Sequence, residues 1–595
     1  MSTALQDGAQ ELAALPNKGS QKTALLFQFE RDGQYHFSGD DRLDPILIGS
    51  KWTVDTLSYS FPTSGSFYEG QGYEQDIDQI GDPALHAVFN PQQQDATRYA
   101  LDLIDAYTGL SFKEITETAD THADLRFSQT RWVEEKSAHA NFPTSKPMAG
   151  DVWFGAFPGQ PFYQTPDKGN WGQATIMHEI GHAVGLKHGH DDYTYSPLNA
   201  YLGLPEDGKP RYGTAALPLE HDGQDWSLMS YRSDPANRDI TFEGDGFNQP
   251  QTFMQDDITA LQFLYGADFG THRGNTVYTW NAKTGEMAID GVGQGAPTAN
   301  TILMTLWDGN GVDTYNLSNY STALSIDLRP GAFSTFSVAQ LANHQAYSGG
   351  HALAAGNVAN ALLYQDDVRS LIENVVGGSA NDRILGNVAA NRLDGGSGAD
   401  TMSGLRGNDT YLVDNAGDRV NESWHGGWDT VASSVSYTLA ANQEIEELRV
   451  ALVAGDRAID LTGNALAQRV IGNDGANVLN GAWGNDVLTG RGGADTFVFA
   501  NALGSNNVDR ITDFATEDTI QLSDDIFTAL APGPLAAGAF KNISTGVADA
   551  NDRLLYKQAT GELFYDADGS GEALKVKVAV FENKVALTAA DFFIV

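Results

Sequence analysis

A nine-residue repeat limits what this chain can fold into more than any other feature of its sequence. Its units begin with glycine in two arrays, Gly377, Gly386, Gly395 and Gly404 and then Gly463, Gly472, Gly481 and Gly490. The sixth position of the units holds Asp382, Asn391, Asp400, Asp409, Gln468, Asn477, Asp486 and Asp495. The eighth position is always apolar or aromatic, namely Ile384, Leu393, Met402, Tyr411, Val470, Leu479, Leu488 and Phe497. A glycine-rich turn and a short strand with one inward side chain, repeated at this interval, predict a parallel β-roll.

The sixth position of the repeat also predicts bound calcium. Glycine permits the positive φ of tight turns, and carboxylate and carbonyl oxygens are the ligands that Ca²⁺ prefers. We therefore expect several structural calcium ions, held by Asp382, Asp400, Asp409, Asp486 and Asp495. A flexible Gly/Asp linker is the alternative, but a linker has no reason to keep its phase over four units twice.

A further glycine-rich turn precedes the arrays. The segment LWDGNGVDTYNLS, residues 306–318, places Asp308 and Asp313 ahead of an expected strand. We expect it to form the first calcium turn, and a plain hairpin turn is the alternative.

Composition excludes several classes of function. The 595 residues carry 36 Lys and Arg against 77 Asp and Glu, and the resulting net charge of −41 disfavours nucleic acids and anionic membrane surfaces as partners. A hydrophobic fraction of 41% is too high for a disordered acidic chain. The absence of cysteine excludes disulfides, thiolate metal sites and a cysteine nucleophile. Neither a secretory signal peptide nor a membrane span is recognisable in the sequence.

The part before the repeats alternates strand and helix patterns. Strands are expected at 57–62, at SFKEIT and ADLRFSQ, and at GDVWFG, residues 150–155; helices are expected at 90–109, from about 172, and at 254–266. Asn90 and Pro91 have the residue types that start a helix. We expect a leader or propeptide at 1–40, an α+β domain at 41–267 and the β-roll domain at 268–595, with arrays at 377–412 and 463–498.

The chemistry is expected at HEIGHAVGLKH, residues 178–188. His178 and His182 lie four residues apart and share one face of a helix, so both can bind one metal ion. Gly185 lets the chain leave the helix in a left-handed turn and bring back His188 as a third ligand. Three imidazoles favour one catalytic Zn²⁺ with an open position for water, and Glu179 is placed to act on that water as a general base.

This motif, followed by SLMSYRS at 227–233, resembles that of the metzincin peptidases. Together with the nine-residue repeats, it is similar to the serralysin family of secreted zinc metalloproteases. The resemblance implies a metzincin-type catalytic domain, with Met229 as an apolar floor under the zinc. It also implies that Tyr231 ligates zinc at rest and stabilises the oxyanion during turnover, and that GDVWFG is the edge strand that pairs with substrate.

Three further expectations accompany the resemblance. The family usually has proline after the third histidine, whereas this chain continues with Gly189, His190, Asp191 and Asp192. We expect His188 rather than His190 to be the third ligand, because His188 fits the spacing. The terminal ADFFIV, Asp591 followed by residues 592–595, is expected to be read by a type I (ABC transporter) secretion apparatus, to form a final strand of the roll, or both. We expect a secreted, extracellular monomeric endopeptidase acting on protein and peptide substrates. A calcium-binding surface or adhesion protein with an inactive protease domain is the alternative.

Overall fold

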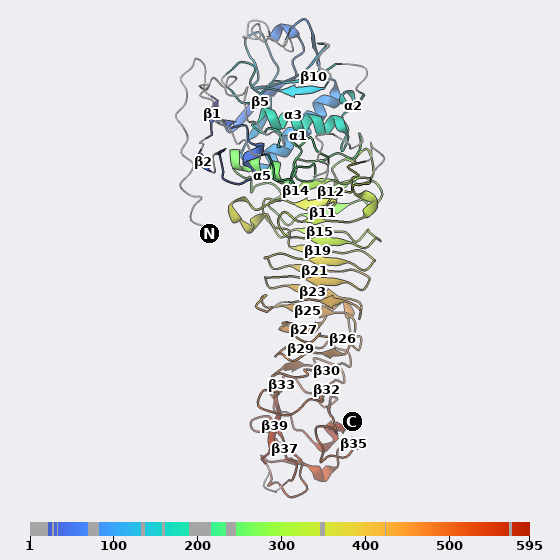
Figure 1. Ribbon diagram of the computed structural model, residues 1–595. Helices are drawn as coiled ribbons and strands as arrows, with labels where there is room; N and C mark the ends of the chain where they lie inside the picture. Colours follow the sequence, from blue (N-terminus) through green and yellow to red (C-terminus); the bar gives the residue numbers. More distant parts are fainter. Residues whose placement is uncertain are drawn as a thin grey trace. The chain divides into compact units, whose positions relative to one another are not determined.

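The computed structural model describes residues 22–26, 29–31, 34–68, 82–132, 137–144, 146–156, 161–189, 216–233, 246–345, 351–422, 424–569 and 574–595. The chain forms two compact units: the first comprises Met1–Asp313 and Pro330–Ile372, the second Thr314–Arg329 and Glu373–Val595 (Figure 1). Residues 268–313 and 330–372 pack with the first unit. The domain boundary at 267/268 stays a prediction. Among the described residues, no helix is both long and apolar enough for a bilayer crossing.

A six-stranded sheet lies in the first unit, in the order β7-β5-β8-β10-β9, with β6 paired to β8. Its strands are β5 (Thr56–Ser60), β6 (His86–Ala87), β7 (Ser111–Glu114), β8 (Leu125–Thr130), β9 (Ala138–Ala140) and β10 (Val152–Gly155). The strands β5, β7, β8 and β10 run parallel, whereas β9 pairs antiparallel with β10.

The predicted edge position of GDVWFG is wrong. This segment forms β10, which lies between β8 and β9, so β9 is the edge strand. All four residues of β10 are buried, whereas those of β9 are half-buried. A strand that is apolar on both faces belongs inside a sheet, and this pattern decides against the edge.

The helices of this unit are α1 (Pro91–Tyr107), α2 (Pro161–Gln164), α3 (Trp171–Ala183) and α5 (Gln255–Tyr265). The start of α1 is as predicted: Asn90 accepts a hydrogen bond from the Gln93 amide at 3.0 Å, and the Gln93 side chain accepts one from the Asn90 amide at 2.9 Å. This reciprocal capping box satisfies two backbone donors at the helix start.

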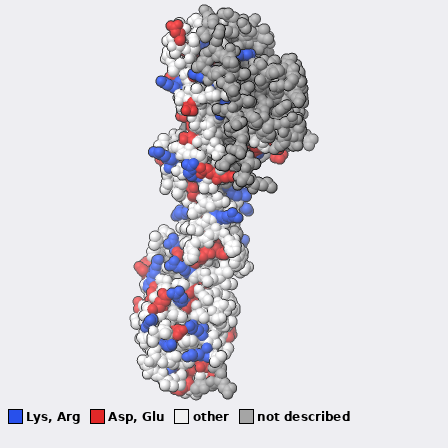
Figure 2. All heavy atoms as spheres, turned by 90° about the vertical axis from the view of Figure 1, so that its left-hand side faces the viewer, with Lys and Arg blue, Asp and Glu red and all other residues white. Residues whose placement is uncertain are grey.

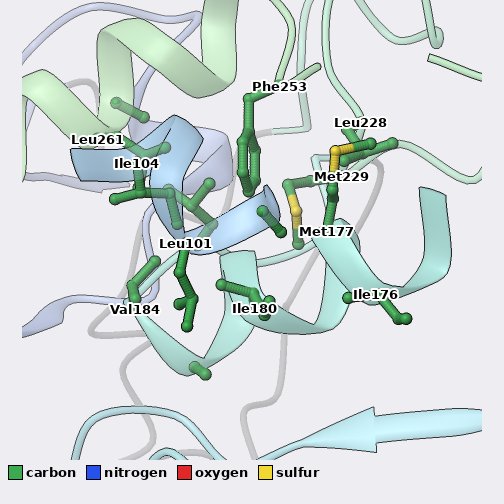
Figure 3. Packing of buried hydrophobic residues seen from close by; sticks show 14 of the residues in the cluster. Leu101, Ile104, Ile176, Met177, Ile180, Val184, Leu228, Met229, Phe253 and Leu261 are labelled. Carbon is green, nitrogen blue, oxygen red and sulfur yellow. The ribbon is translucent and has the colours of Figure 1, made fainter. Parts of the chain in front are cut away.

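One hydrophobic core joins these helices (Figure 3). Met177 and Ile180 of α3 are fully buried, as are Leu101 of α1 and Leu261 of α5. The buried face of α3 therefore fixes this helix in the middle of the unit, where it carries the histidines of the motif.

Shorter strands complete the first unit. They are β1 (Thr23–Leu25) with β4 (Ser50–Trp52), β2 (Phe29–Arg31) with β3 (Gln34–His36), β11 (Val277–Trp280) with β12 (Met287–Ile289) and β13 (Val292–Gly293), and β14 (Met304–Leu306) with β17 (Phe333–Ser334) and β18 (Val358–Asn360). The Asp44 carboxylate accepts hydrogen bonds from the amides of residues 37, 38 and 39, so this part of the expected leader segment is hydrogen-bonded into the unit.

Parallel strands stack in the second unit, as the repeats predict (Figure 1). One sheet contains β15 (Thr314–Asn316), β19 (Asn374–Val376), β21 (Arg392–Asp394), β23 (Thr410–Val413), β25 (Thr430–Ser433), β27 (Glu447–Val450), β29 (Arg469–Ile471), β31 (Val487–Thr489), β33 (Asp509–Ile511) and β39 (Val576–Phe581). Antiparallel additions to it are β38 (Glu562–Tyr565) and β37 (Leu554–Lys557), and β36 (Phe540–Asn542) follows parallel to β37.

Two further sheets supply the other strands of the coils. They are β16 (Ser325–Asp327), β20 (Arg383–Leu385), β22 (Thr401–Ser403) and β24 (Arg419–Val420), and then β26 (Tyr437–Thr438), β28 (Leu461–Thr462), β30 (Val478–Asn480), β32 (Thr496–Phe499), β34 (Thr519–Leu522), β40 (Phe592–Ile594) and β35 (Gly533–Pro534). In β40, Phe592 and Ile594 are buried and the strand pairs with β34, so the final-strand reading of ADFFIV is confirmed.

The register of these strands follows the repeat. Arg392 pairs with Thr410, two nine-residue units later, so two units make one coil. All eight apolar or aromatic residues of the eighth position are at most 1% exposed. The repeated side chain therefore forms the core of the roll, which excludes the flexible-linker alternative.

Many acidic side chains of this unit are buried in its turns. The aspartates at the sixth position of the repeats are at most 3% exposed. The surface in view carries basic side chains as well as acidic ones (Figure 2). Arg469 lies 3.5 Å from the carboxylate of Glu447. The high net charge of the chain is thus concentrated partly in buried groups, where it needs compensation.

Candidate metal centre

Three imidazoles meet on one side of α3. His178 and His182 belong to the helix, and the turn after it brings in His188. The Nε2 atoms of His182 and His188 are 3.0 Å apart, and those of His188 and His178 are 3.1 Å apart. The structure therefore brings together the three histidines that the spacing singles out.

Hydrogen bonds to backbone carbonyls fix the protonation of two of these rings. Nδ1 of His178 donates to the Leu228 carbonyl at 2.9 Å, and Nδ1 of His182 donates to the Leu186 carbonyl at 2.8 Å. Burial first, and then the neighbouring histidines, hold the pKa of His182 well below its usual value, so this ring is neutral. With the proton on Nδ1, each Nε2 presents a lone pair to the centre of the cluster.

This arrangement fits a zinc ion. Lone pairs about 3 Å apart repel one another unless a cation lies between them. Nitrogens bound tetrahedrally to Zn²⁺ at about 2.0–2.1 Å lie roughly 3.3 Å from each other, close to the 3.0 and 3.1 Å seen here. The backbone carbonyls that orient the rings are the outer partners typical of metal-bound histidines.

Gly185 makes the turn that carries His188 back to the helix. Its φ of +115° is one that side-chain-bearing residues rarely adopt. A Cβ at this position would lie 2.7 Å from the Ser50 carbonyl oxygen, which belongs to the backbone of β4. The turn therefore needs glycine both for its conformation and for this close approach.

Residues from the N-terminal part of the chain hold the same turn in place. The Ile48 amide donates to the Gly185 carbonyl at 3.0 Å, and the Lys187 amide donates to the Ile46 carbonyl at 2.7 Å. The Trp52 indole donates to the Ala183 carbonyl at 2.9 Å. The bonds to Gly185 and Ala183 satisfy carbonyls at and just after the end of α3 that would otherwise be left open, and sequence patterns gave no sign of any of the three.

Met229, which the resemblance places under the zinc, lies against α3. It is fully buried beside Met177 of α3 (Figure 3). A Cβ on Gly181, between the two helical histidines, would lie 2.7 Å from the Met229 sulfur. The glycine therefore permits the close approach of the methionine to the helix.

Asp257, which sequence reasoning missed, anchors the segment that contains Met229. Its carboxylate accepts hydrogen bonds from the Ser227 hydroxyl at 2.6 Å, the Leu228 amide at 2.7 Å and the Met254 amide at 3.0 Å. Burial raises its pKa to about 7. An acidic residue in the first turn of a buried helix was the available signal, but helix capping alone explains that position equally well.

The other two residues of the expected machinery lie next to the histidines. The Tyr231 ring centre is 4.2 Å from that of His188 and 5.7 Å from that of His178, with 46% of the residue exposed. Glu179 is 6% exposed and follows His178 on α3. An accessible phenol beside His188 suits a site that is open on one side. His190, Asp191 and Asp192 lie outside the described residues.

The predicted first calcium turn contains two buried carboxyls. Asp308 and Asp313 are 1% and 0% exposed. Burial raises the pKa of Asp308 to about 8 and that of Asp313 to about 6. The Tyr278 hydroxyl donates to Asp308 at 2.6 Å. Burying an ionised carboxylate without a compensating cation is energetically unfavourable. The burial of Asp308 and Asp313 therefore supports their choice as calcium ligands.

The aspartates of the repeats form ladders along the roll. Oδ1 of Asp400 accepts from the Asp382 amide one coil earlier at 2.7 Å, and Oδ1 of Asp486 accepts from the Gln468 amide in the same way at 2.7 Å. A second, buried oxygen without a hydrogen-bond partner among the described residues is found in Asp400, Asp409, Asp486 and Asp495. Burial raises the pKa of Asp486 to about 8 and that of Asp400 to about 7. Buried carboxylate oxygens without a hydrogen-bond partner, next to glycine turns, are suitable ligands for Ca²⁺.

The structure extends these ladders beyond the eight units. Asp418, Asp429, Asp509 and Asp518 each accept the amide of a sixth-position aspartate one coil earlier. Asp418 could have been found, because it lies in phase with Asp382 and Asp400 although Val413 replaces the first glycine of its unit. Insertions shift Asp429, Asp509 and Asp518 out of the nine-residue phase and hide them from a search for a fixed period.

Comparisons with known proteins agree with these features. The family described as "Peptidase M10 serralysin C terminal" matches residues 267–530. The chain is 30% identical over 300 residues to serralysin B from Dickeya chrysanthemi, covering 49% of this chain and 53% of that protein. It is 30% identical over 379 residues to serralysin from Proteus mirabilis (61% and 66%) and 29% identical over 361 residues to metallopeptidase AprA from Pseudomonas marginalis (60% and 63%). The chain thus spans about half the length of the first of these relatives and up to about two thirds of the others.

Proposed function

The chain belongs to the serralysin family, and on this premise we propose that it is a secreted zinc-dependent endopeptidase. The observation that carries the proposal is the meeting of the Nε2 atoms of His178, His182 and His188 at 3.0 and 3.1 Å. We assign the catalytic, metzincin-type domain to residues 41–267 and the calcium-binding β-roll to 268–595. Protein and peptide substrates, export through a type I (ABC transporter) apparatus and a monomeric state are parts of the same proposal and rest on family membership.

In this proposal the three imidazoles hold one zinc ion. Bound zinc supplies Lewis-acid polarisation of the scissile carbonyl and activation of a water molecule. Glu179 takes the proton of the attacking water as general base and delivers it to the leaving amine. The Tyr231 phenol, which is exposed beside His188, ligates the zinc at rest and donates a hydrogen bond to the oxyanion during turnover.

Structural calcium completes the proposal. The ligands are Asp308 and Asp313 of the first turn and the repeat aspartates Asp382, Asp400, Asp409, Asp486 and Asp495. Their burial and raised pKa values support this assignment, since ionised carboxylates in such places need a compensating cation.

Replacing Glu179 by Gln tests the proposed mechanism. The variant should retain its zinc, because the three imidazoles are unchanged, and should lose casein cleavage by about 10²–10⁴-fold, the typical contribution of a general base. Glu220→Gln is the matched control, because Glu220 is exposed, and it should cleave casein like the wild type. Normal cleavage by Glu179→Gln would disprove the assigned role.

The same measurements separate the second candidate, a calcium-binding surface or adhesion protein. It is favoured by the ladders of buried aspartates, which need no protease to account for them. A wild-type protein that binds calcium, contains no zinc after purification in zinc-containing buffer and cleaves no casein would support that reading.

A further inference from the structure

His344 lies far from the histidine motif in the sequence and is buried next to the segment that carries Met229. It is 1% exposed, and its Nε2 donates to Oδ1 of the buried Asp225 at 2.7 Å. The other carboxylate oxygen of Asp225 accepts the Ala355 amide at 3.0 Å. Both partners of Asp225 come from residues 330–372, which pack with the first unit although they follow the predicted catalytic domain in the sequence.

A third contact from the same region holds the residue after Asp225. The Trp226 indole stacks on the Phe333 ring, with the ring centres 4.7 Å apart and the planes inclined by 25°. The Trp226 carbonyl accepts the Asp256 amide of α5 at 3.0 Å. Asp225 and Trp226 are therefore held both by α5 and by residues 330–372.

The backbone that carries His344 is itself fixed in place. The His344 amide donates to the Ala352 carbonyl at 2.7 Å, and the Ala354 amide donates to the Ala342 carbonyl at 2.9 Å. Ala342 and Ala354 pack in one buried cluster with Met254, the residue from which α5 begins. The imidazole of His344 therefore has a defined position relative to the start of this helix.

The chemistry of His344 indicates that it orients its neighbour rather than merely filling space. Its Nδ1 is buried and has no hydrogen-bond partner among the described residues. A buried polar atom without a partner is energetically unfavourable, whereas an apolar side chain of similar size would avoid this penalty. What the histidine supplies, and an apolar residue would not, is the hydrogen bond from Nε2 to Asp225.

The segment that Asp225 begins reaches the histidine cluster three residues later. The Leu228 carbonyl accepts the Nδ1 proton of His178 at 2.9 Å, and Met229 lies against α3 (Figure 3). A displacement of residues 225–229 would therefore move the acceptor that orients His178. Because the three imidazoles have to direct their Nε2 lone pairs at one point, a tilt of this ring weakens the binding of a shared metal ion.

From these contacts we infer that His344 is a positioning residue of the histidine cluster. Through Asp225 it holds residues 225–229 in the place from which the Leu228 carbonyl orients His178. The inference rests on the proposed zinc-binding function and adds to it a residue from outside the predicted catalytic domain.

Zinc competition with a chelator, carried out on the full-length protein, tests the inference. His344→Leu removes the hydrogen-bond donor at similar volume and should lower the zinc affinity by about tenfold, the lower end of the range for partners behind a metal ligand. His344→Gln keeps an N–H group that can reach Asp225 and should recover most of this loss. His351→Leu is the matched control, because His351 is an exposed histidine close by in the sequence, and its zinc affinity should equal that of the wild type. Identical zinc affinity in His344→Leu and the wild type would overturn the inference.

Hydrogen exchange in the chelator-treated protein separates positioning from a general loss of stability. The amides of residues 222–230 should exchange faster in His344→Leu than in the wild type, while those of α1 should exchange at the wild-type rate. Faster exchange spread evenly over both segments, with unchanged zinc affinity, would identify His344 as a structural residue and overturn the inference. This measurement requires no metal, so it also decides the matter if the wild type binds no zinc, a result that by itself would refute only the proposed function.

A second variant keeps the inference testable if His344→Leu does not fold. Asp225→Asn preserves the shape of the side chain, but its amide has one oxygen in place of two, so it cannot accept from both His344 and Ala355. The zinc affinity should fall, and residues 222–230 should exchange faster than in the wild type. Wild-type values of both quantities would contradict the assigned role of the pair.

Discussion

Replacing Gly185 by Ala should loosen the turn that positions the third histidine. The backbone is at φ +115°, and a side-chain-bearing residue in such a region costs about 1–3 kcal/mol. The new methyl group would also lie 2.7 Å from the Ser50 carbonyl oxygen. This oxygen is part of a paired strand and has little freedom to move, so overpacking adds about 1–3 kcal/mol.

We therefore expect Gly185→Ala to lower the free energy of unfolding by about 2–6 kcal/mol. At roughly 2.1 cal/mol/K of unfolding entropy per residue, each kcal/mol corresponds to about 1–2 °C in melting temperature for a first unit of this length. Differential scanning calorimetry of the full chain gives the shift. Zinc competition with a chelator gives the second readout, and the zinc affinity should fall because the turn carries His188.

Gly266→Ala separates the two contributions. Gly266 has φ +77° and no atom within 4 Å of the place where a Cβ would lie. It should therefore show the conformational strain without the steric clash, about 1–3 kcal/mol, and no change in zinc affinity. Equal losses of stability in the two variants would refute the argument that contact with Ser50 constrains the turn.

Trp52→Phe should lower the free energy of unfolding by about 1–3 kcal/mol, because the Ala183 carbonyl loses its buried donor; thermal unfolding measures it. Met229→Ala should lower the free energy of unfolding by about 2–5 kcal/mol, because this side chain is fully buried. Denaturant titration measures this loss, and the zinc content of the variant is a second readout. In EGTA, the folded pKa values of Asp486 and Asp495, about 8 and 7, exceed the unfolded value of about 3.9. The chelated roll should therefore lose stability as the pH rises from about 4 to 8, and its melting temperature should be lower at pH 8 than at pH 5. Saturating calcium should remove this dependence at neutral pH, since it binds the ionised carboxylates, and a melting temperature that rises with pH in EGTA would contradict the reasoning.

The periodic parts of the fold could be predicted from the sequence because their geometry is local. The nine-residue phase determines which side chains enter the core of the roll, and all of them are buried as expected, from Ile384 to Phe497. The Asn90–Pro91 start of α1 is equally local, since the cap bonds a residue three positions away. Such features depend on neighbours along the chain, and those are what a single sequence displays.

Features that depend on distant neighbours could not be predicted. The pairing of Ile48 with Gly185 joins segments that are far apart in the sequence, and neither residue type signals it. The position of β10 inside the sheet agrees with its uninterrupted run of buried apolar residues and not with the edge position that the family resemblance implies. Asp429 escaped notice because an insertion precedes it, although it occupies the same place in its coil as Asp409 does.

The direction of the carboxylate ladder has a consequence for how the roll is made. Each coil has an amide that is satisfied by an aspartate of the coil that follows it, as the Leu324 amide is by Asp382 and the Asp382 amide by Asp400. During synthesis from the N-terminus, the newest turn always lacks this acceptor until another eighteen or more residues have emerged. Order in the roll should therefore spread backward from later turns to earlier ones, against the direction of translation.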